Sequence, residues 1–164
     1  MSIDLILETW APAHPEGAGG APAPGLRSRP HRRLVLEDSW AGLHFVLTNE
    51  VPVPRNVLEA DDVAWIGEVV DEALMGGTVA SGSGWHAVRV HDVDRVRPIA
   101  HALSSITAAA LRGHFDPQWF MENRIHPETW EPADIDLLLD AFAQLRDFYQ
   151  HAAAAGQGVE LRIV

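Results

Sequence analysis

Two residue types are missing from this chain of 164 residues, which contains no cysteine and no lysine. Without cysteine there is no disulfide, no thiolate ligand for zinc or an iron–sulfur cluster, and no cysteine nucleophile. Without lysine there is no phosphate-binding P-loop of the Walker type, no Schiff base and no covalently held pyridoxal phosphate. All 12 basic residues are arginine, and the sequence indicates no cofactor.

Positive charge is scarce, because 23 acidic residues outweigh the 12 arginines and leave a net charge of −11. Such a surface repels the phosphates of nucleic acids and the anionic headgroups of membranes. No apolar run approaches the roughly 20 residues of a transmembrane helix. The start of the chain lacks the basic and apolar regions of a signal peptide. We therefore expect a cytoplasmic protein that binds neither nucleic acid nor membrane.

The hydrophobic pattern predicts an α/β fold, a single compact domain with a mixed sheet flanked by helices. Residues 1–33 read as an N-terminal strand at 3–10 followed by a linker rich in proline, glycine and alanine, and residues 34–164 read as the compact domain. Strands are expected at 42–48, 85–90 and 159–164, and helices at 61–75, 94–111, 117–123 and 132–155.

Nine histidines are many for so acidic a chain, yet no two of them stand three or four residues apart, as a metal-binding pair on one helix would. His91-Asp92 followed by Asp94 comes nearest to a metal site. Its position between a strand and a helix favours a different role for an aspartate, that of a helix N-cap. No metal site is therefore predicted.

Four residues stand out as ligand or interface candidates, and two others as a structural pair. His44 interrupts an apolar run, and His86 follows Trp85 beside a glycine-rich turn. The interface set is Trp40, His44, Trp85 and His86. Arg146 lies at the edge of the apolar stripe of the last helix, where a partly buried guanidinium needs a carboxylate, and Asp116 is its expected partner.

Several short segments occur in an order that resembles a known family. They are Trp40-Ala-Gly-Leu-His-Phe-Val-Leu-Thr48, Phe115-Asp-Pro117, Ile125-His-Pro127 with Trp130, and Leu145-Arg-Asp-Phe-Tyr149. Together they are similar to the YfbM-like family of bacterial proteins (domain of unknown function 1877), over roughly residues 34–164. The resemblance implies a compact α/β domain and no established activity or catalytic residues.

No reactive constellation is visible, whereas six tryptophans are available, a residue type enriched at interfaces. The sequence therefore favours a non-enzymatic binding or protein-interaction domain without catalytic residues, with a partner protein or a second copy as its ligand. The alternative is a hydrolase that uses a metal or histidines with carboxylates. In a third interpretation, the acidic chain is an inhibitor-like partner of a basic protein.

Overall fold

The computed structural model describes residues 3–11, 32–50 and 66–164. In chain order the elements are β1 (Leu5–Trp10), β2 (Arg33–Leu36), α1 (Ser39–Thr48), α2 (Ile66–Met75), β3 (Thr78–Ser81), the 3-10 turn η1 (Gly84–His86), β4 (Val88–His91), α3 (Val93–Ser105), α4 (Ala108–His114), α5 (Pro117–Glu122), the 3-10 turn η2 (Pro132–Asp134), α6 (Ile135–Ala154) and β5 (Gly158–Ile163). The predicted α/β architecture is confirmed. No helix in these ranges is both long and apolar enough to cross a membrane.

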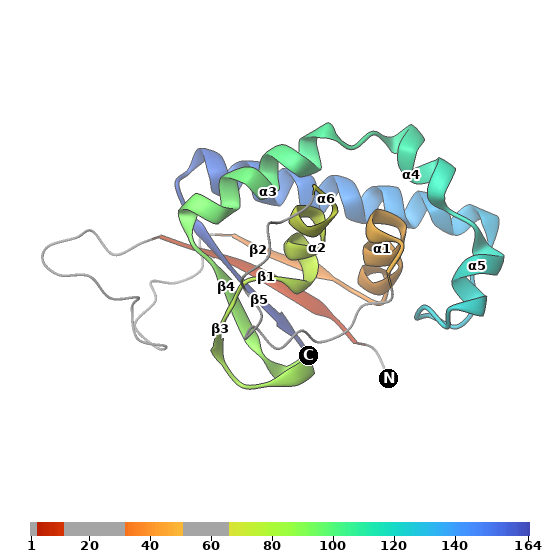
Figure 1. Cartoon of the computed structure of the whole chain (residues 1–164), viewed down its shortest axis with the longest axis horizontal. Helices are drawn as coiled ribbons and strands as arrows, with labels where there is room; N and C mark the ends of the chain where they lie inside the picture. Colours follow the sequence, from red (N-terminus) through yellow and green to blue (C-terminus); the bar gives the residue numbers. More distant parts are fainter. Residues whose placement is uncertain (1–2, 12–31, 51–65) are drawn as a thin grey trace, which may run out of the picture.

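The described strands form one sheet in the order β2-β1-β5-β4-β3 (Figure 1). Every pairing is antiparallel, so the sheet is not the mixed one that we expected. Strand direction depends on how often the intervening helices reverse the chain, which the hydrophobic pattern does not reveal. β1 lies between β2 and β5, so residues on both sides of the expected linker share a sheet. The division at residue 33 stays a prediction.

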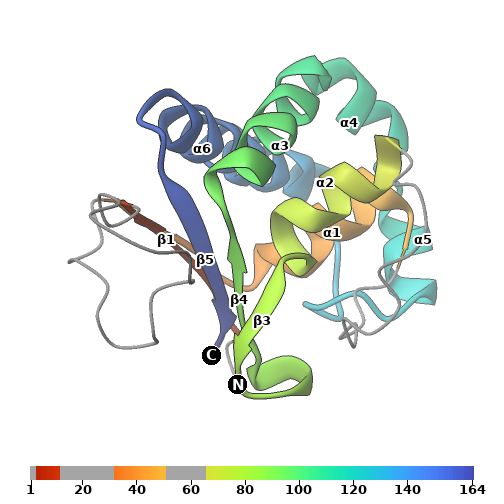
Figure 2. The same ribbon diagram turned by 60° about the vertical axis from the view of Figure 1, so that its left-hand side comes forward.

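Alternation along the strands separates two faces of the sheet. Leu5 and Leu7 of β1 stand opposite Ile163 and Leu161 of β5, and all four are buried. Glu8 lies on the other face, where it pairs with arginines of both neighbouring strands. The helices cover the face that carries the leucines, and Figure 2 shows α1, α2 and α3 on one side of the sheet.

The segment expected as a strand at 42–48 is instead part of helix α1, and that prediction was wrong. All residues from Trp40 to Val46 are buried, so the helix has no polar face. A helix that is apolar all round gives the same short apolar run as a buried strand. Gly42 lies where a Cβ would overlap the benzo ring of Trp130. Glycine therefore lets α1 and Trp130 pack closely.

Trp130 belongs to an aromatic cluster that anchors the end of the domain formed by α1, α4 and α5. Phe120 lies at its centre, with ring centroids 5.0 Å from Phe45, 5.0 Å from Phe115 and 4.9 Å from Trp130. All three contacts have edge-to-face geometry, which aromatic rings prefer.

Several other elements follow the sequence pattern closely. The predicted cap is confirmed, because Asp116 accepts hydrogen bonds from the backbone N–H groups of Gln118 and Trp119, and Pro117 opens α5. The long helix and the closing strand are confirmed as α6 and β5.

Other elements differ from the prediction. The helix expected at 94–111 divides instead into α3 and α4, because Thr107 caps a new helix. β2 and β3 were not predicted, and residues 61–65 of the expected helix 61–75 lie outside the described ranges.

Candidate functional site

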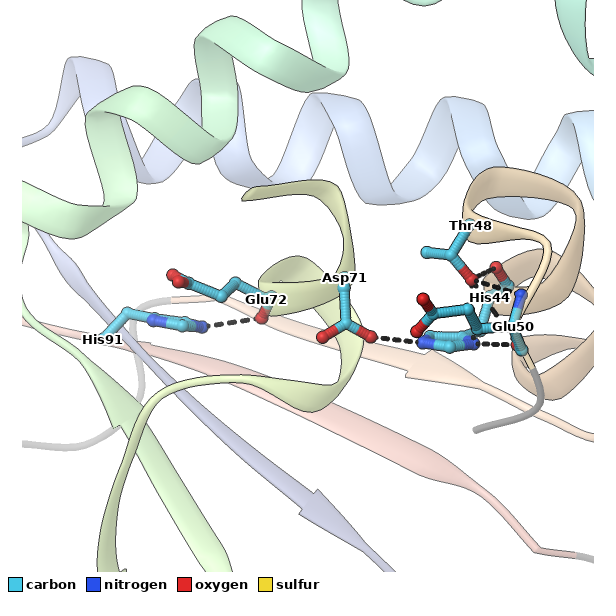
Figure 3. Close-up of polar contacts among 6 residues, drawn as sticks. All are labelled: His44, Thr48, Glu50, Asp71, Glu72 and His91. Carbon is cyan, nitrogen blue, oxygen red and sulfur yellow. Dashed lines mark hydrogen bonds and ion pairs between the residues drawn. The ribbon is translucent and has the colours of Figure 1, made fainter. Parts of the chain in front are cut away.

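A buried histidine–aspartate pair joins helices α1 and α2 (Figure 3). His44 Nε2 lies 2.5 Å from Asp71 Oδ1, and the side chains are 2% and 5% exposed. The other ring nitrogen, Nδ1, lies 3.0 Å from the carbonyl oxygen of Glu50. A carbonyl only accepts, so Nδ1 carries a proton and donates it. A second proton then lies between Nε2 and the carboxylate, and the pair holds the two helices together by a charge-assisted bond.

Thr48 fixes the end of α1 beside this pair. Its hydroxyl donates to the carbonyl of His44 at 2.8 Å and accepts the backbone N–H of Glu50 at 3.1 Å. Asn49, in the left-handed conformation at φ 57°, closes the helix with a bond to Phe45 O. The backbone of Glu50 is therefore held in reach of the imidazole.

The last turn of α2 is bonded through its backbone carbonyls. His91 Nε2 donates to Glu72 O at 2.9 Å, and the Tyr149 hydroxyl donates to Ala73 O at 2.8 Å. The carboxylate of Glu72 also pairs with Arg95. Helix C-termini leave carbonyls without helical partners, and Tyr149 supplies a partner for Ala73 O. Glu72 O also accepts the backbone N–H of Gly76 at 3.1 Å, so His91 adds a second bond to that carbonyl. Burial lowers the pKa of His91 and raises the pKa of Tyr149 well above its usual value, so both rings stay neutral.

Both nitrogens of His44 and one nitrogen of His91 are thus occupied by bonds that hold helices in place. A cap role was expected for Asp92 or Asp94, and it is Asp92 that accepts the backbone N–H of Arg95 at 2.8 Å and caps α3. Within residues 3–11, 32–50 and 66–164, no group of three or more histidine, aspartate or glutamate side chains is placed to hold a metal ion.

The structure brings two of the four predicted interface residues together. Trp40 is buried in the first turn of α1, where its indole N–H donates to Ile3 O at 2.9 Å. Its ring lies edge-to-face with that of Trp85, at 6.2 Å between centroids, and Trp85 is 39% exposed. His86 is exposed beside Trp85. His44, one turn along α1 from Trp40, lies inside the protein.

Arg89 was missed by the sequence analysis. It is only 3% exposed, and Nη2 donates to Gly84 O at 3.2 Å, while Nε has no hydrogen-bond partner among the described residues. Burial lowers the pKa of its guanidinium. In the strand Val-Arg-Val-His, Arg89 and His91 are the buried residues and the two valines are less buried. Alternation of apolar and polar residues would place the two valines toward the core and Arg89 and His91 toward solvent. The sequence pattern therefore indicates the wrong face of the strand.

Asp116 and Arg146 have different partners in the structure. Asp116 caps α5, as described above, whereas Arg146 Nε lies 3.9 Å from a carboxylate oxygen of its neighbour Asp147. The Arg146 guanidinium also lies 5.7 Å from the centroid of the Phe142 ring. These contacts are local to α5 and α6 respectively.

A hollow of about 680 Å³ lies between the β2–α1 connection and the start of α6. Its lining comprises Val35, Leu36, Glu37, Asp38, Ser39, Pro127, Thr129, Trp130, Glu131, Asp134, Leu137, Asp140, Ala141 and Gln144. This acidic hollow has five carboxylates and, among these described residues, no arginine or histidine. Asp38 accepts a bond from His126 Nε2 at 3.2 Å, and Glu131 and Asp134 form a capping box. Leu137 is 62% exposed and Val35 39%.

A family model described as "Domain of unknown function (DUF1877)" matches residues 24–161. The chain belongs to this family. A solved structure of a protein of unknown function, YfbM from Escherichia coli, is similar to this DUF1877 protein in fold, with a TM-score of 0.63 and 20% sequence identity. The match covers 81% of each chain. A search of curated proteins finds no significant match. The resemblance to the YfbM-like family is thus confirmed. It establishes the fold of the chain, and it assigns no activity.

Proposed function

We propose that this DUF1877 protein is a non-enzymatic binding domain whose acidic hollow takes a segment of a partner protein carrying arginine or lysine beside apolar side chains. The supporting observation is the lining of the hollow, which combines five carboxylates with exposed aliphatic side chains and has no basic residue among its described members. The imidazoles of His44 and His91 are used in structural bonds, which fits a binding role better than a hydrolytic one.

The partner's chemistry follows from the charges. Carboxylates that share a concave surface repel one another, and a cation placed between them relieves that repulsion. Glu37 precedes α1 and Asp140 lies on α6, and both are exposed, so they reach the hollow from different elements. Leu137 offers a partner's apolar side chain a surface to bury. A net charge of −11 steers a basic partner toward the chain at long range.

Calorimetric titration with two peptides tests this proposal. One peptide repeats arginine, leucine and glycine, and the other has glutamate in place of arginine. We expect the arginine peptide to bind, with an affinity that falls as salt is added, and the glutamate peptide not to bind. Asp140→Arg should weaken binding about tenfold or more, because it places a cation in the hollow.

Asp147→Arg is the matched control, since it makes the same charge change on the same helix outside the lining of the hollow. The proposal fails if both variants weaken binding equally, or if the two peptides bind alike. It also fails if sedimentation finds a dimer that Leu137→Asp dissociates, because the hollow would then be covered by a second copy.

A further inference from the structure

Arg89 is a buried cation that has no anionic partner in the part of the chain that the structure describes. Its side chain lies on β4, on the face covered by helices, opposite Val79 of β3 and Leu161 of β5. Within the described ranges its one hydrogen bond goes to the backbone carbonyl of Gly84, and no carboxylate pairs with it. A guanidinium stays charged in proteins. A buried charge that lacks a counter-charge is among the most costly arrangements in a fold.

Other arginines of the chain show the usual arrangement. Arg95 pairs with Glu72, Arg112 with Asp136 and Arg162 with Glu8, and their side chains are 35%, 54% and 38% exposed. These three have both a carboxylate and water to solvate the charge. Arg89 is more deeply buried than these three, and among the described residues only the carbonyl oxygen of Gly84 is hydrogen-bonded to its guanidinium.

The surroundings of Arg89 place an aromatic surface next to that charge. Gly84, whose carbonyl contacts the guanidinium, is followed directly by Trp85, which is partly exposed and packs against Trp40. A Cβ built on Gly84 would meet no heavy atom within 4 Å, so there is open space beside the turn. An oxyanion that arrives along this turn would find guanidinium N–H donors, and an attached apolar group would find the Trp85 ring.

We propose that Arg89 is the anchor of an anion site that takes a carboxylate or phosphate group, with Trp85 and Trp40 packing against the rest of the ligand. Planar guanidinium donors match the oxygens of such groups in pairs. Trp40 and Trp85, selected from the sequence as interface residues, then have a defined role. Neither Arg89 nor the two tryptophans line the acidic hollow, and the two sites would take ligands of opposite charge. The anion-site proposal therefore does not rest on the proposed function.

The test is thermal unfolding of the full chain in the presence of acetate, benzoate or inorganic phosphate, with chloride at matched ionic strength as the reference. A ligand that binds the folded state alone raises the melting temperature with its concentration. We expect a saturable rise with at least one of the three anions. The rise should be lost in Arg89→Met, which keeps most of the volume of the buried side chain. It should be kept in Arg97→Met, because the Arg97 side chain is 64% exposed. A larger rise with benzoate than with acetate would show that the tryptophans take part, and a rise with phosphate alone would assign a phosphate ligand.

A second measurement does not require the Arg89 variant to fold. Tryptophan fluorescence of the wild-type chain should change on titration with the same anion, and Trp85→Phe should lose most of that change. The proposal is overturned if none of the three anions alters either signal beyond the chloride reference. It is also overturned if Arg89→Met folds and responds like the wild-type chain.

Discussion

Replacing Gly42 with alanine tests the close approach of α1 and Trp130. The added methyl group would overlap the Trp130 ring. That ring is 6% exposed and lies against Phe115 and Phe120, so it has little room to move. Overpacking of this kind costs about 1–3 kcal/mol, and overlap with two atoms of a buried ring places Gly42→Ala at the upper end, about 3 kcal/mol. Alanine recovers about 1 kcal/mol through its better helix propensity, and we expect a net loss of about 2 kcal/mol in the free energy of unfolding.

Gly113→Ala is the matched control. Gly113 also lies in a helix, α4, but a Cβ there would meet no atom within 4 Å. This variant should gain about 1 kcal/mol from propensity alone, so the two substitutions should differ in sign and by about 3 kcal/mol. Urea denaturation measures both values. In a thermal scan, Gly42→Ala should melt roughly 4–8 °C below the wild-type chain.

A double variant shows whether the overlap is the cause. Gly42→Ala combined with Trp130→Phe should cost less than the sum of the single variants, because the smaller ring leaves room for the methyl group. If Gly42→Ala were as stable as Gly113→Ala, or if the two costs simply added, the packing argument for α1 would be refuted.

Three further predictions concern the polar contacts. His44→Leu should cost about 3–5 kcal/mol, since it removes the histidine from a buried pair with the Asp71 carboxylate. The double variant with Asp71→Leu should cost less than the summed single costs in urea denaturation; additive costs would argue against the pair. Burial lowers the pKa of His91, so the unfolded chain binds this proton at a higher pH than the folded chain. Stability should therefore fall as the pH drops below about 6.5 toward the folded pKa, and His91→Gln should flatten that part of a urea-based stability–pH profile; an unchanged profile would contradict the assignment. Asp116→Ala should cost about 1 kcal/mol through loss of the α5 cap, and Asp116→Asn less, a difference that thermal unfolding resolves; equal losses would mean that the cap bonds contribute little.

Local signals predicted the parts of the fold that depend on neighbours in the chain. The cap at Asp116-Pro117 and the apolar stripe of α6 act within one or two helical turns, so they are visible in a short window of sequence. The same window misled us for α1, because burial on all sides removes the periodicity that separates a helix from a strand. It also missed β2, whose four residues are too few to show an alternation.

The candidate sites divide in a similar way. Trp40 and Trp85 could be selected as interface candidates from the sequence, but the burial of Trp40 and its contact with Trp85 could not be foreseen. The partner of His44 lies 27 residues away in Asp71, and no local pattern links the two. The acidic hollow combines residues from the β2–α1 connection with residues of α6, so it exists only once the chain has folded.

By itself, the sequence determined which chemistry is excluded, the acidic charge, the family and the helices with one apolar face, because composition and short-range periodicity are properties of the chain alone. The tertiary structure decided the antiparallel sheet, the helical form of residues 39–48 and the inward position of Arg89. Each of these depends on which distant residues pack together, and packing energy over long sequence separations outweighs local preference.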